Sequence, residues 1–235
     1  MDPEKKKIRA RRQLKRIARA LEIERTNLAK ESRLIKYETD GAFDYELYKH
    51  VQTLGNVMKI DNQWVNEDHI ALLCRYLNDA GHVVEQGICH GTRRGREQAW
   101  FADHLVGASK VIGTEISDTA TDFENTIQWD FHEVKDEWRG RIDLIYSNSW
   151  DHSYDPEKAF SAWVSCLAPG GYMLLDHGWN FLPDKVDLLD GFGISEDGLI
   201  DLLNRVCGSF GRVETVLDGG KHKRHKIRTV VFKGA

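Results

Sequence analysis

The chain has 235 residues, of which 41% are hydrophobic and 30% are charged, with 20 glycines and only 4 prolines. This composition is typical of a folded globular protein, and it excludes collagen-like and mostly disordered chains. No run of apolar residues reaches the roughly 18 that a membrane span needs, and no apolar segment follows the charged N-terminus. We therefore expect neither a membrane span nor a secretory signal.

The cysteines indicate a reducing, cytoplasmic compartment. They are widely spaced and form no C-x-x-C pair: Cys74, Cys89, Cys166 and Cys207. This spacing indicates neither a zinc ribbon nor a disulfide framework.

The charges are divided unevenly along the chain. The formal net charge is −4, but residues 1–20 carry nine Lys or Arg against two Asp or Glu, a net +7, which leaves −11 on residues 21–235. A basic end of this kind can face a nucleic acid or an anionic surface. The alternative is a solvated helix that only keeps the protein soluble.

The first segment predicts one long helix. Residues 8–35 lack Pro and Gly and are rich in Arg, Lys, Leu, Ala and Glu. Apolar residues recur there at intervals of seven: Leu14, Leu21, Leu28 and Ile35. A two-stranded coiled coil needs a second apolar position in each heptad, and here that position is mostly polar. Packing of the helix against the rest of the chain or against a partner subunit is therefore favoured. We treat residues 1–36 as a basic N-terminal helix through which a homo-oligomer could form.

Two shorter helices are predicted next, over residues 43–60 and 66–80. The second has a stripe of apolar residues at helical spacing, with Asn66 as its N-cap and Gly81 at its end. We group residues 37–80 as a helical accessory segment that covers a cleft in the rest of the chain.

From residue 81 onward, short apolar runs alternate with helix-length stretches, which is the pattern of a parallel sheet covered by helices. Strands are predicted at 82–86, 111–115, 126–129, 142–147, 172–176, 212–218 and 227–233. The last two are joined by the turn-rich segment GGKHKRHK, so we expect an antiparallel hairpin. The predicted fold of residues 81–235 is α/β, with a seven-stranded, mostly parallel sheet whose last strand is antiparallel, preceded by the N-terminal helices.

Features suited to a nucleotide follow the first three strands. Gly87 and Gly91 fall at the first strand-to-helix turn, where a ligand can approach the backbone and its exposed N–H groups. Glu115 ends the second strand, where a carboxylate can accept both ribose hydroxyls of an adenosine ligand. Asp130 follows the third strand and could accept from an adenine amino group. Each feature alone also fits a structural turn or a helix cap, but three in order favour an adenosine-type ligand.

Residues 81–235 resemble the class I S-adenosylmethionine-dependent methyltransferases. The first loop of that family reads acidic-x-G-x-G-x-G, which Glu85, Gly87 and Gly91 match, with Cys89 in place of the middle glycine. The segment DLIYSNSWDHSYDPEKAFSAWVSCLAPGGYMLLDH resembles the family's fourth and fifth strands, including an L-x-P-G-G turn that begins at Leu167. The resemblance implies a Rossmann-like methyltransferase domain with S-adenosyl-L-methionine as its cofactor.

The resemblance also implies which residues hold the donor, with Glu115 on the ribose and Asp130 on the adenine. The implied cofactor contacts are Glu85, Gly87, Ile88, Cys89, Gly91, Glu115, Ile116, Asp130, Phe131, Ser147 and Asn148. A nicotinamide-binding Rossmann enzyme is the main competitor. Its G-x-G-x-x-G spacing would require glycine at Cys89 and Thr92, which the chain does not have.

Two histidines follow strands at the edge of the sheet where substrates collect, His152 after the fourth strand and His177 after the fifth. A neutral nitrogen acceptor needs no base, whereas an alcohol must lose its proton, and histidine suits that task near neutral pH. We predict His152, His177 and the adjacent Asp151 as catalytic residues. The alternative is that His152 caps a helix and His177 is a loop residue.

Metal dependence stays open at this stage. The D-H-S-Y segment that begins at Asp151 resembles the loop of metal-dependent O-methyltransferases, in which Asp151 and Asp176 would supply oxygen ligands to magnesium. The segment also resembles that of metal-free members. His177 stands where an acidic or amide ligand is expected, and imidazole is a poor ligand for magnesium, which favours a metal-free site.

Aromatic residues after the fourth and fifth strands predict a pocket wall that can stack on a sugar or a flat ring: Trp150, Tyr154 and Trp179. We expect methyl transfer to an oxygen or nitrogen of a small molecule or glycan. One alternative is an RNA or other nucleic-acid methyltransferase that uses the basic N-terminal helix and the basic hairpin at 221–226. Another is a catalytically silent methyltransferase-like binding module.

Overall fold

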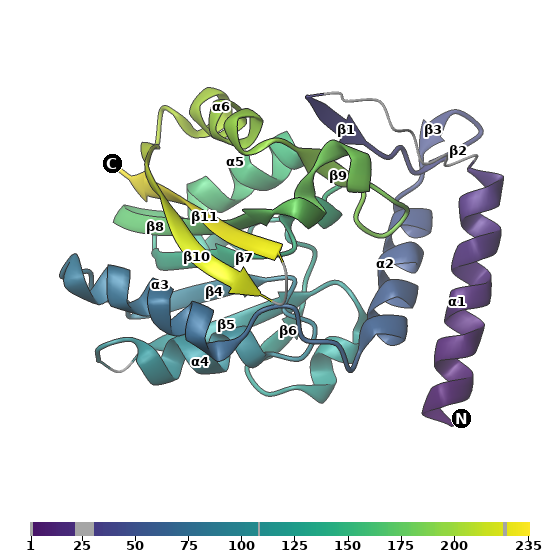
Figure 1. Cartoon of the computed structure of the whole chain (residues 1–235), viewed down its shortest axis with the longest axis horizontal. Coiled ribbons are helices and arrows are strands. Elements are labelled where there is room, and N and C mark those ends of the chain that lie inside the picture. Colours follow the sequence, from purple (N-terminus) through teal and green to yellow (C-terminus); the bar gives the residue numbers. More distant parts are fainter. Residues whose placement is uncertain (1, 22–30, 108, 223–224) are drawn as a thin grey trace.

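The computed structural model describes residues 2–21, 31–107, 109–222 and 225–235, and a seven-stranded sheet with helices on both faces lies at its centre (Figure 1). The spatial order of the strands is β10-β11-β8-β7-β4-β5-β6. Their bounds are β4 (Gln86–His90), β5 (Lys110–Glu115), β6 (Thr126–Gln128), β7 (Ile142–Ser147), β8 (Leu167–Gly178), β10 (Gly211–His222) and β11 (His225–Gly234). Strands β4 to β8 are parallel, whereas β11 runs antiparallel to both β8 and β10. The predicted α/β fold with its terminal antiparallel hairpin is confirmed.

Two helices cover each face of the sheet. Their bounds are α3 (Glu67–Asp79), α4 (Arg96–His104), α5 (Pro156–Cys166) and α6 (Glu196–Cys207). On one face, Leu73 and Leu77 of α3 and Phe101 of α4 are fully buried in one apolar cluster. On the other face, Trp163 of α5 and Leu203 of α6 belong to a second cluster. Each helix begins at a capping side chain where the sequence offers one; Asn66, for example, accepts from the backbone N–H of His69.

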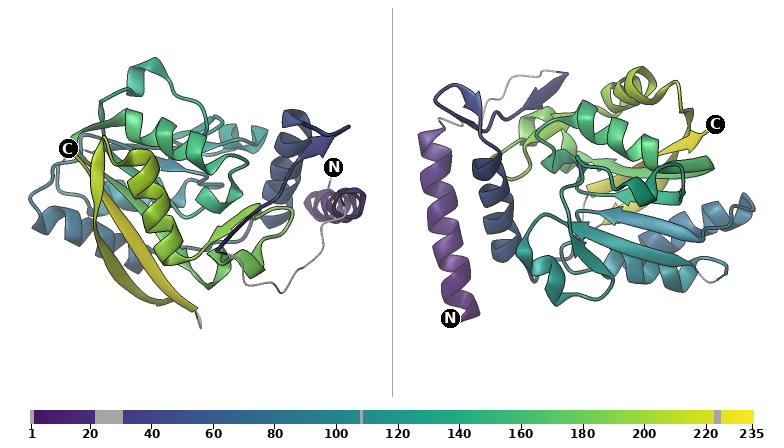
Figure 2. Two further views of the ribbon diagram at one scale, coloured as in Figure 1. Left: turned by 90° about the horizontal axis from the view of Figure 1, so that it is seen from above. Right: turned by 180° about the vertical axis from the view of Figure 1, so that it is seen from behind.

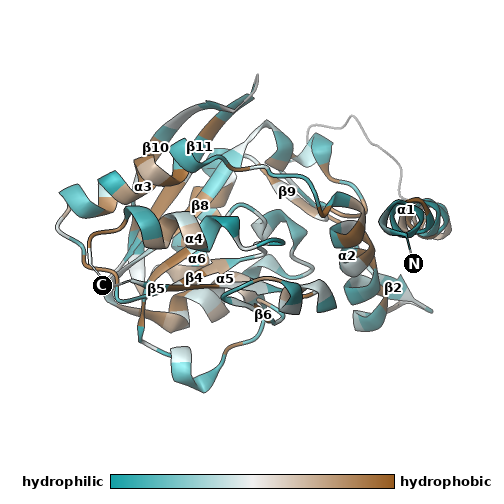
Figure 3. Ribbon diagram, turned by 90° about the horizontal axis from the view of Figure 1, so that it is seen from below, coloured by the Kyte–Doolittle hydropathy of each residue, from teal (hydrophilic) through white to brown (hydrophobic). Residues whose placement is uncertain are grey.

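The N-terminal elements form a separate layer beside the carboxyl ends of the parallel strands (Figure 2). They are α1 (Pro3–Ala20), β1 (Ser32–Leu34), β2 (Glu38–Thr39), β3 (Ala42–Phe43) and α2 (Tyr45–Lys59). Helix α1 packs on α2 and shows hydrophilic colouring over most of its surface (Figure 3). A third apolar group, which we call the outer cluster, joins this layer to the segment before β9 (Phe192–Ile194): Ala10, Leu14, Ile35, Tyr37, Tyr48, Val51, Leu54, Val186, Leu188 and Leu189.

The predicted N-terminal helix over residues 8–35 is too long. Helix α1 ends at Ala20, and Leu28 lies outside the described residues. Residues Ser32–Leu34 form β1, which pairs antiparallel with β9, and Ile35 is buried in the outer cluster. Helical spacing could not reveal this strand, because its partner lies about 160 residues further along the chain.

The first strand of the sheet also begins later than the predicted range of 82–86. Strand β4 starts at Gln86 and continues to His90, pairing with β5 and β7. Before it, the backbone N–H groups of Glu85 and Gln86 donate to the Asp143 carboxylate, each at 2.9 Å. The apolar pair at residues 83–84 suggested a strand, but Val83 is 63% exposed. Among the described residues, no helix is both long and apolar enough to cross a membrane.

Candidate functional site

Two cavities lie where the carboxyl ends of the parallel strands meet α2. The inner cavity, of about 40 Å³, is lined by residues that include Tyr48, Asn56, Gly91, Glu115, Asp130 and Phe131. The outer cavity, of about 560 Å³, is lined by residues that include Trp64, Asn148, Asp151, Trp179, Lys185 and Asp190. The two share one wall, formed by Lys59, Arg93, Ser149 and His152. Ligands of open α/β sheets bind at this edge.

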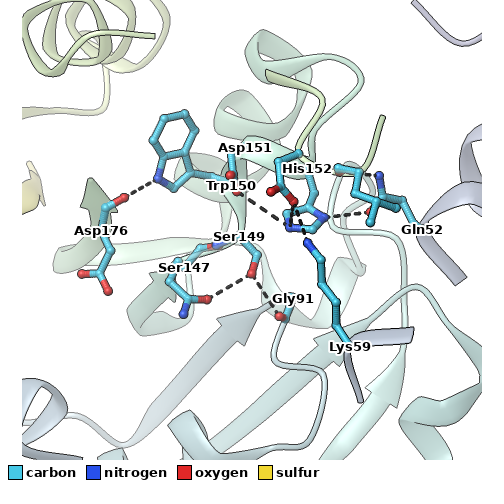
Figure 4. A network of polar contacts seen from close by, with 12 residues as sticks. Gln52, Lys59, Gly91, Ser147, Ser149, Trp150, Asp151, His152 and Asp176 are labelled. Carbon is cyan, nitrogen blue, oxygen red and sulfur yellow. Dashed lines mark hydrogen bonds and ion pairs between the residues drawn. The ribbon is translucent and has the colours of Figure 1, made fainter. Parts of the chain in front are cut away.

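The turn after β4 presents its backbone to the inner cavity. Gly91, Arg93 and Gly95 have positive φ angles of 76°, 46° and 71°. A Cβ atom at Gly91 would lie 2.7 Å from the Cβ of Ser149, so only glycine allows the turn to pass this close to the loop after β7. The Ser149 hydroxyl donates to the Gly91 carbonyl at 3.2 Å (Figure 4).

The later start of β4 changes the position of four predicted cofactor contacts. Glu85 is exposed before the strand, while Gly87, Ile88 and Cys89 are buried inside it. None of the four lies in the turn where they were predicted, and none lines either cavity. The alternating positions of the turn are Gly91, Arg93 and Gly95, four residues further along than the motif match suggested.

The predicted ribose and adenine residues both line the inner cavity. Glu115 is 8% exposed, accepts from the backbone N–H of Ser117 at 3.1 Å, and has a pKa raised by burial. Asp130 binds His132 through one oxygen, which accepts from the His132 backbone N–H at 3.0 Å. Burial opposes ionisation of Asp130, but the contacts with His132 outweigh it and hold the pKa below its usual value.

Several polar atoms that face the inner cavity are buried without a hydrogen bond of ordinary geometry among the described residues. They are the second oxygen of Asp130 and both polar atoms of the Asn56 amide. Tyr45 lies near Asp130 and Glu115 lies near Asn56, but these contacts lack ordinary hydrogen-bond geometry. Buried polar atoms without good hydrogen bonds are costly, so their position here fits a ligand that carries donors and acceptors. Three other predicted cofactor contacts also line the cavities: Ile116 and Phe131 line the inner one, and Asn148 lines the outer one. Ser147 lines neither cavity, and its hydroxyl donates to the His90 carbonyl.

His152 lies on the shared wall, held by α2. Its Nδ1 is 2.8 Å from Oε1 of Gln52, and Nε2 of Gln52 donates to the Leu189 carbonyl at 3.0 Å (Figure 4). A carbonyl can only accept, so the amide nitrogen of Gln52 must face Leu189 and its oxygen must face His152. Nδ1 of His152 therefore carries the proton, and Nε2 keeps a free lone pair. Burial lowers the pKa of His152 to about 4, so the ring is neutral at pH 7.

Two carboxylates and one lysine surround Nε2 of His152. Asp190 Oδ1 lies 3.3 Å from Nε2 and 3.1 Å from Lys59 Nζ, and Asp151 Oδ1 lies 4.0 Å from Nε2. Burial, together with the charge of Asp190, raises the pKa of Asp151 well above its usual value. Burial also opposes the ionisation of Asp190, but Lys59 and His152 outweigh it and hold the pKa of Asp190 low.

The same groups are the candidate metal ligands among the described residues. One ligand atom each from Asp151, His152 and Asp190 lies within 4.8 Å of the others. Lys59 already places an ammonium group against Asp190, so the chain supplies a cation at this point itself. The predicted partner of Asp151 in a magnesium site, Asp176, is turned into the core, where its oxygens accept from Tyr146 at 2.6 Å and Thr229 at 2.7 Å.

Of the other predicted site residues, His177 and Trp179 line the outer cavity, whereas Trp150 and Tyr154 line neither cavity. Trp150 is 1% exposed in the core and donates through Nε1 to the Asp176 carbonyl at 2.6 Å, so it does not form a pocket wall. Tyr154 stacks on His132 at 3.8 Å between ring centroids and lines neither cavity. His177 is not in a loop but near the end of β8, where Nε2 donates to the Ile194 carbonyl at 2.9 Å. Trp179 does line the outer cavity, stacked on His225.

Sequence reasoning missed the residues that α2 and the segment before β9 bring to the site. These are Gln52, Asn56, Lys59 and Asp190, together with Arg93 of the turn. Of these, only Arg93 had a local signal, since it stands between two glycines at alternating positions. The residues of α2 lie about 90 to 100 positions before His152 and Asp190 lies about 40 positions after it, and only packing places them together.

Neither a protein-family model nor a curated protein sequence matches this chain. Among solved structures, the 1,6-didemethyltoxoflavin-N1-methyltransferase of Burkholderia thailandensis, with 1,6-didemethyltoxoflavin and S-adenosylhomocysteine bound, aligns with a TM-score of 0.62 at 14% identity, covering 86% of this chain and 94% of that chain. The mitomycin 7-O-methyltransferase MmcR aligns with a TM-score of 0.60 at 15% identity, covering 97% of this chain and 68% of that chain.

The chain has the fold of the class I methyltransferases. The same fold is shared by the 4+2 cyclase SpnF, which aligns with a TM-score of 0.51 at 9% identity over 70% of this chain and 80% of that chain. A class I methyltransferase fold therefore does not by itself specify the reaction, which has to be argued from the residues of the site.

Proposed function

We propose that the chain is an S-adenosylmethionine-dependent methyltransferase that methylates an oxygen or nitrogen of a small molecule or glycan. The observation that carries this proposal is the wall shared by the two cavities, at which Arg93, Ser149 and His152 face both. A donor on the inner side and an acceptor on the outer side would meet there. Holding two reactants close and aligned is the main catalytic requirement of methyl transfer.

The inner cavity suits the donor because its polar groups match an adenosine. Glu115 offers carboxylate oxygens to ribose hydroxyls, and the second oxygen of Asp130, which lacks a hydrogen bond of ordinary geometry although the Tyr45 hydroxyl is close to this carboxylate, can accept from an adenine amino group. The backbone of the Gly91 turn can approach the ligand closely. When bound, the sulfonium donor supplies an electrophilic methyl group. Solved structures with this fold include methyltransferases that act on nitrogen and on oxygen.

His152 is positioned to take the proton that the acceptor loses. Nε2 has a free lone pair on the shared wall, because Gln52 fixes the proton on Nδ1. Once Nε2 is protonated, it can donate to Asp190 Oδ1, 3.3 Å away, which stabilises the imidazolium. Lys59 holds Asp190 in place at 3.1 Å. In this proposal His152 and not His177 is the base, because the His152 side chain is 23% exposed whereas His177 is only 3% exposed.

Calorimetric titration with S-adenosylmethionine and S-adenosylhomocysteine tests the donor site. We expect saturable micromolar binding of both, and Glu115→Ala should weaken it by at least about tenfold, because a charged hydrogen bond contributes roughly 1.5 to 3 kcal/mol. Glu85→Ala is the matched control: Glu85 is exposed and precedes β4, so its loss should leave donor affinity within about twofold. Equal loss in the two variants, or no binding to the folded protein, would overturn the assignment.

Methyl transfer itself needs a separate readout. Radioactive methyl transfer from the donor to hydroxylated and amino aromatic compounds and sugars should give labelled product, and His152→Gln should reduce turnover of hydroxyl acceptors by roughly 10²-fold or more while leaving donor affinity unchanged. Donor binding with no transfer to any acceptor class would instead favour a binding module.

A further inference from the structure

The face of α1 that points away from α2 carries a straight row of cations. Helix α1 buries Ala10 and Leu14 against the outer cluster. On the opposite face lie five exposed residues spaced by four, three, four and three positions, which we call the basic stripe: Lys5, Arg9, Arg12, Arg16 and Arg19. This spacing places them on one line along the helix, about 21 Å long at a rise of about 1.5 Å per residue.

The basic stripe has no counter-charges of its own. From residue 5 to residue 20 the helix contains no acidic residue. Within the ranges that the structure describes, none of the five side chains forms an ion pair, whereas Lys7, on another side of the helix, pairs with Asp61. Stabilisation of α1 therefore does not explain the stripe, because like charges on neighbouring turns of one helix destabilise it.

We infer that the basic stripe is a docking surface for the phosphodiester backbone of a nucleic acid. A linear row of closely spaced cations complements a linear row of phosphates, and four of the five residues are Arg, whose planar guanidinium group binds phosphate through two parallel hydrogen bonds. The stripe has no aromatic residue to stack on bases and no amide side chain to read them, so binding is independent of sequence.

A lipid bilayer fits this surface less well. Amphipathic helices that bind membranes insert an apolar face, and the apolar face of α1 is occupied by α2. The large apolar residue that α1 exposes is Ile8, at 45%. A nucleic acid needs no such face, since its binding is driven by release of counterions from phosphates.

The stripe is separate from the two cavities. Helix α2 lies between α1 and the sheet (Figures 1 and 2). The inner cavity is lined by residues of α2, such as Asn56, and no described residue of α1 lines either cavity. The nucleic acid would hold the enzyme in place without entering the cavity where the proposed methyl transfer occurs. This inference therefore does not depend on the proposed function.

Fluorescence anisotropy of the full chain with a labelled 20-mer RNA and a labelled 20-base-pair DNA tests the inference at several salt concentrations. Five phosphate contacts predict a slope of log K against log salt of about −4.5 for duplex DNA, so a fourfold rise in salt should lower the affinity by about 500-fold. Two scrambled sequences should bind with the same affinity. Absence of saturable binding at 50 mM salt would overturn the inference.

Two matched variants assign the binding to the stripe. The stripe variant replaces Lys5, Arg9, Arg12, Arg16 and Arg19 with Gln and should lose at least 100-fold in affinity at 100 mM salt, with a slope near zero. The control variant changes the same kinds of residues, exposed on the α/β domain, to Gln: Arg75, Arg96, Lys110, Arg141 and Arg212. It should bind within twofold of the wild-type protein.

Circular dichroism and donor titration of both variants check that the fold is intact, since Gln keeps a high helix propensity. Equal losses in the stripe and control variants would overturn the assignment to α1. Binding to vesicles of anionic phospholipid that outcompetes both nucleic acids would also overturn it, in favour of a membrane surface.

Discussion

At the scale of single residues, Gln52 connects α2 to the candidate catalytic histidine. Both ends of its amide are engaged, the nitrogen with the Leu189 carbonyl and the oxygen with Nδ1 of His152. The side chain is 6% exposed, so water does not compete strongly for these bonds. In the proposed mechanism Gln52 is a positioning residue, because it acts on the acceptor only through His152.

Replacing Gln52 with Glu should change the protonation of His152. A carboxylate at Nδ1 favours the charged imidazolium, so the pKa of His152 should rise from about 4 to near or above its ordinary value of 6.5. Nitrogen-15 NMR of histidine-labelled protein, assigned with His152→Gln, measures this directly. The wild-type ring should be neutral at pH 7 with the proton on Nδ1, and Gln86→Glu, at an exposed position, should leave it so. A neutral ring with the proton on Nε2 in the wild type would contradict the tautomer that we assign.

The lowered pKa of His152 also predicts how stability depends on pH. The folded protein binds this proton only below about pH 4, whereas the unfolded chain binds it below about 6.5. The unfolded state therefore binds more protons in between, and the free energy of unfolding decreases as the pH falls from about 6.5 toward 4. Between pH 7.5 and 5, wild type should lose about 1 to 2 kcal/mol more than His152→Gln, measured by urea unfolding. His50→Gln, at an exposed position, should behave like wild type.

At the scale of elements, the sequence predicted segments with local signals better than segments whose structure depends on distant contacts. Helices α2 and α3 begin and end within about two residues of their predicted bounds, since caps and apolar spacing are local signals. The bounds of β4 were misplaced because Val83, an apolar neighbour, is exposed. Strand β1 was missed because its pairing with β9 is a tertiary contact.

Helix α2 should move when the donor binds. The inner cavity, at about 40 Å³, has room for a few water molecules but not for a nucleoside, and Tyr48 and Asn56 of α2 line it. The helix packs through the outer cluster and not through the two clusters on the sheet, so it can open without disturbing them. Hydrogen exchange of residues 45–59 should be faster than that of β7 and should slow at saturating S-adenosylhomocysteine. Exchange in α2 as slow as in β7, with or without ligand, would contradict this.

At the scale of the whole molecule, the sequence specified the layers of the fold but not the composition of the site. Alternating strands and helices predicted the seven-stranded sheet, and its topology placed Glu115 and Asp130 at the same edge. Lys59 and Asp190 could not be predicted there, because α2 and the segment before β9 carry no motif for the surface they contact. The site depends on how two separately packed parts of the chain fit together.

These two parts should differ in stability. Leu14 belongs to the outer cluster, whereas Leu203 belongs to the cluster between α6 and the sheet and is fully buried. Leu203→Ala should lower the global free energy of unfolding by about 2 to 5 kcal/mol, because it opens a cavity in the main core. Leu14→Ala should speed hydrogen exchange in α1 and α2. It should change the global free energy of unfolding, measured from the slowest-exchanging amides of β7, by less than about 0.5 kcal/mol. Equal global losses in the two variants would mean that the outer cluster and the sheet unfold as one cooperative unit.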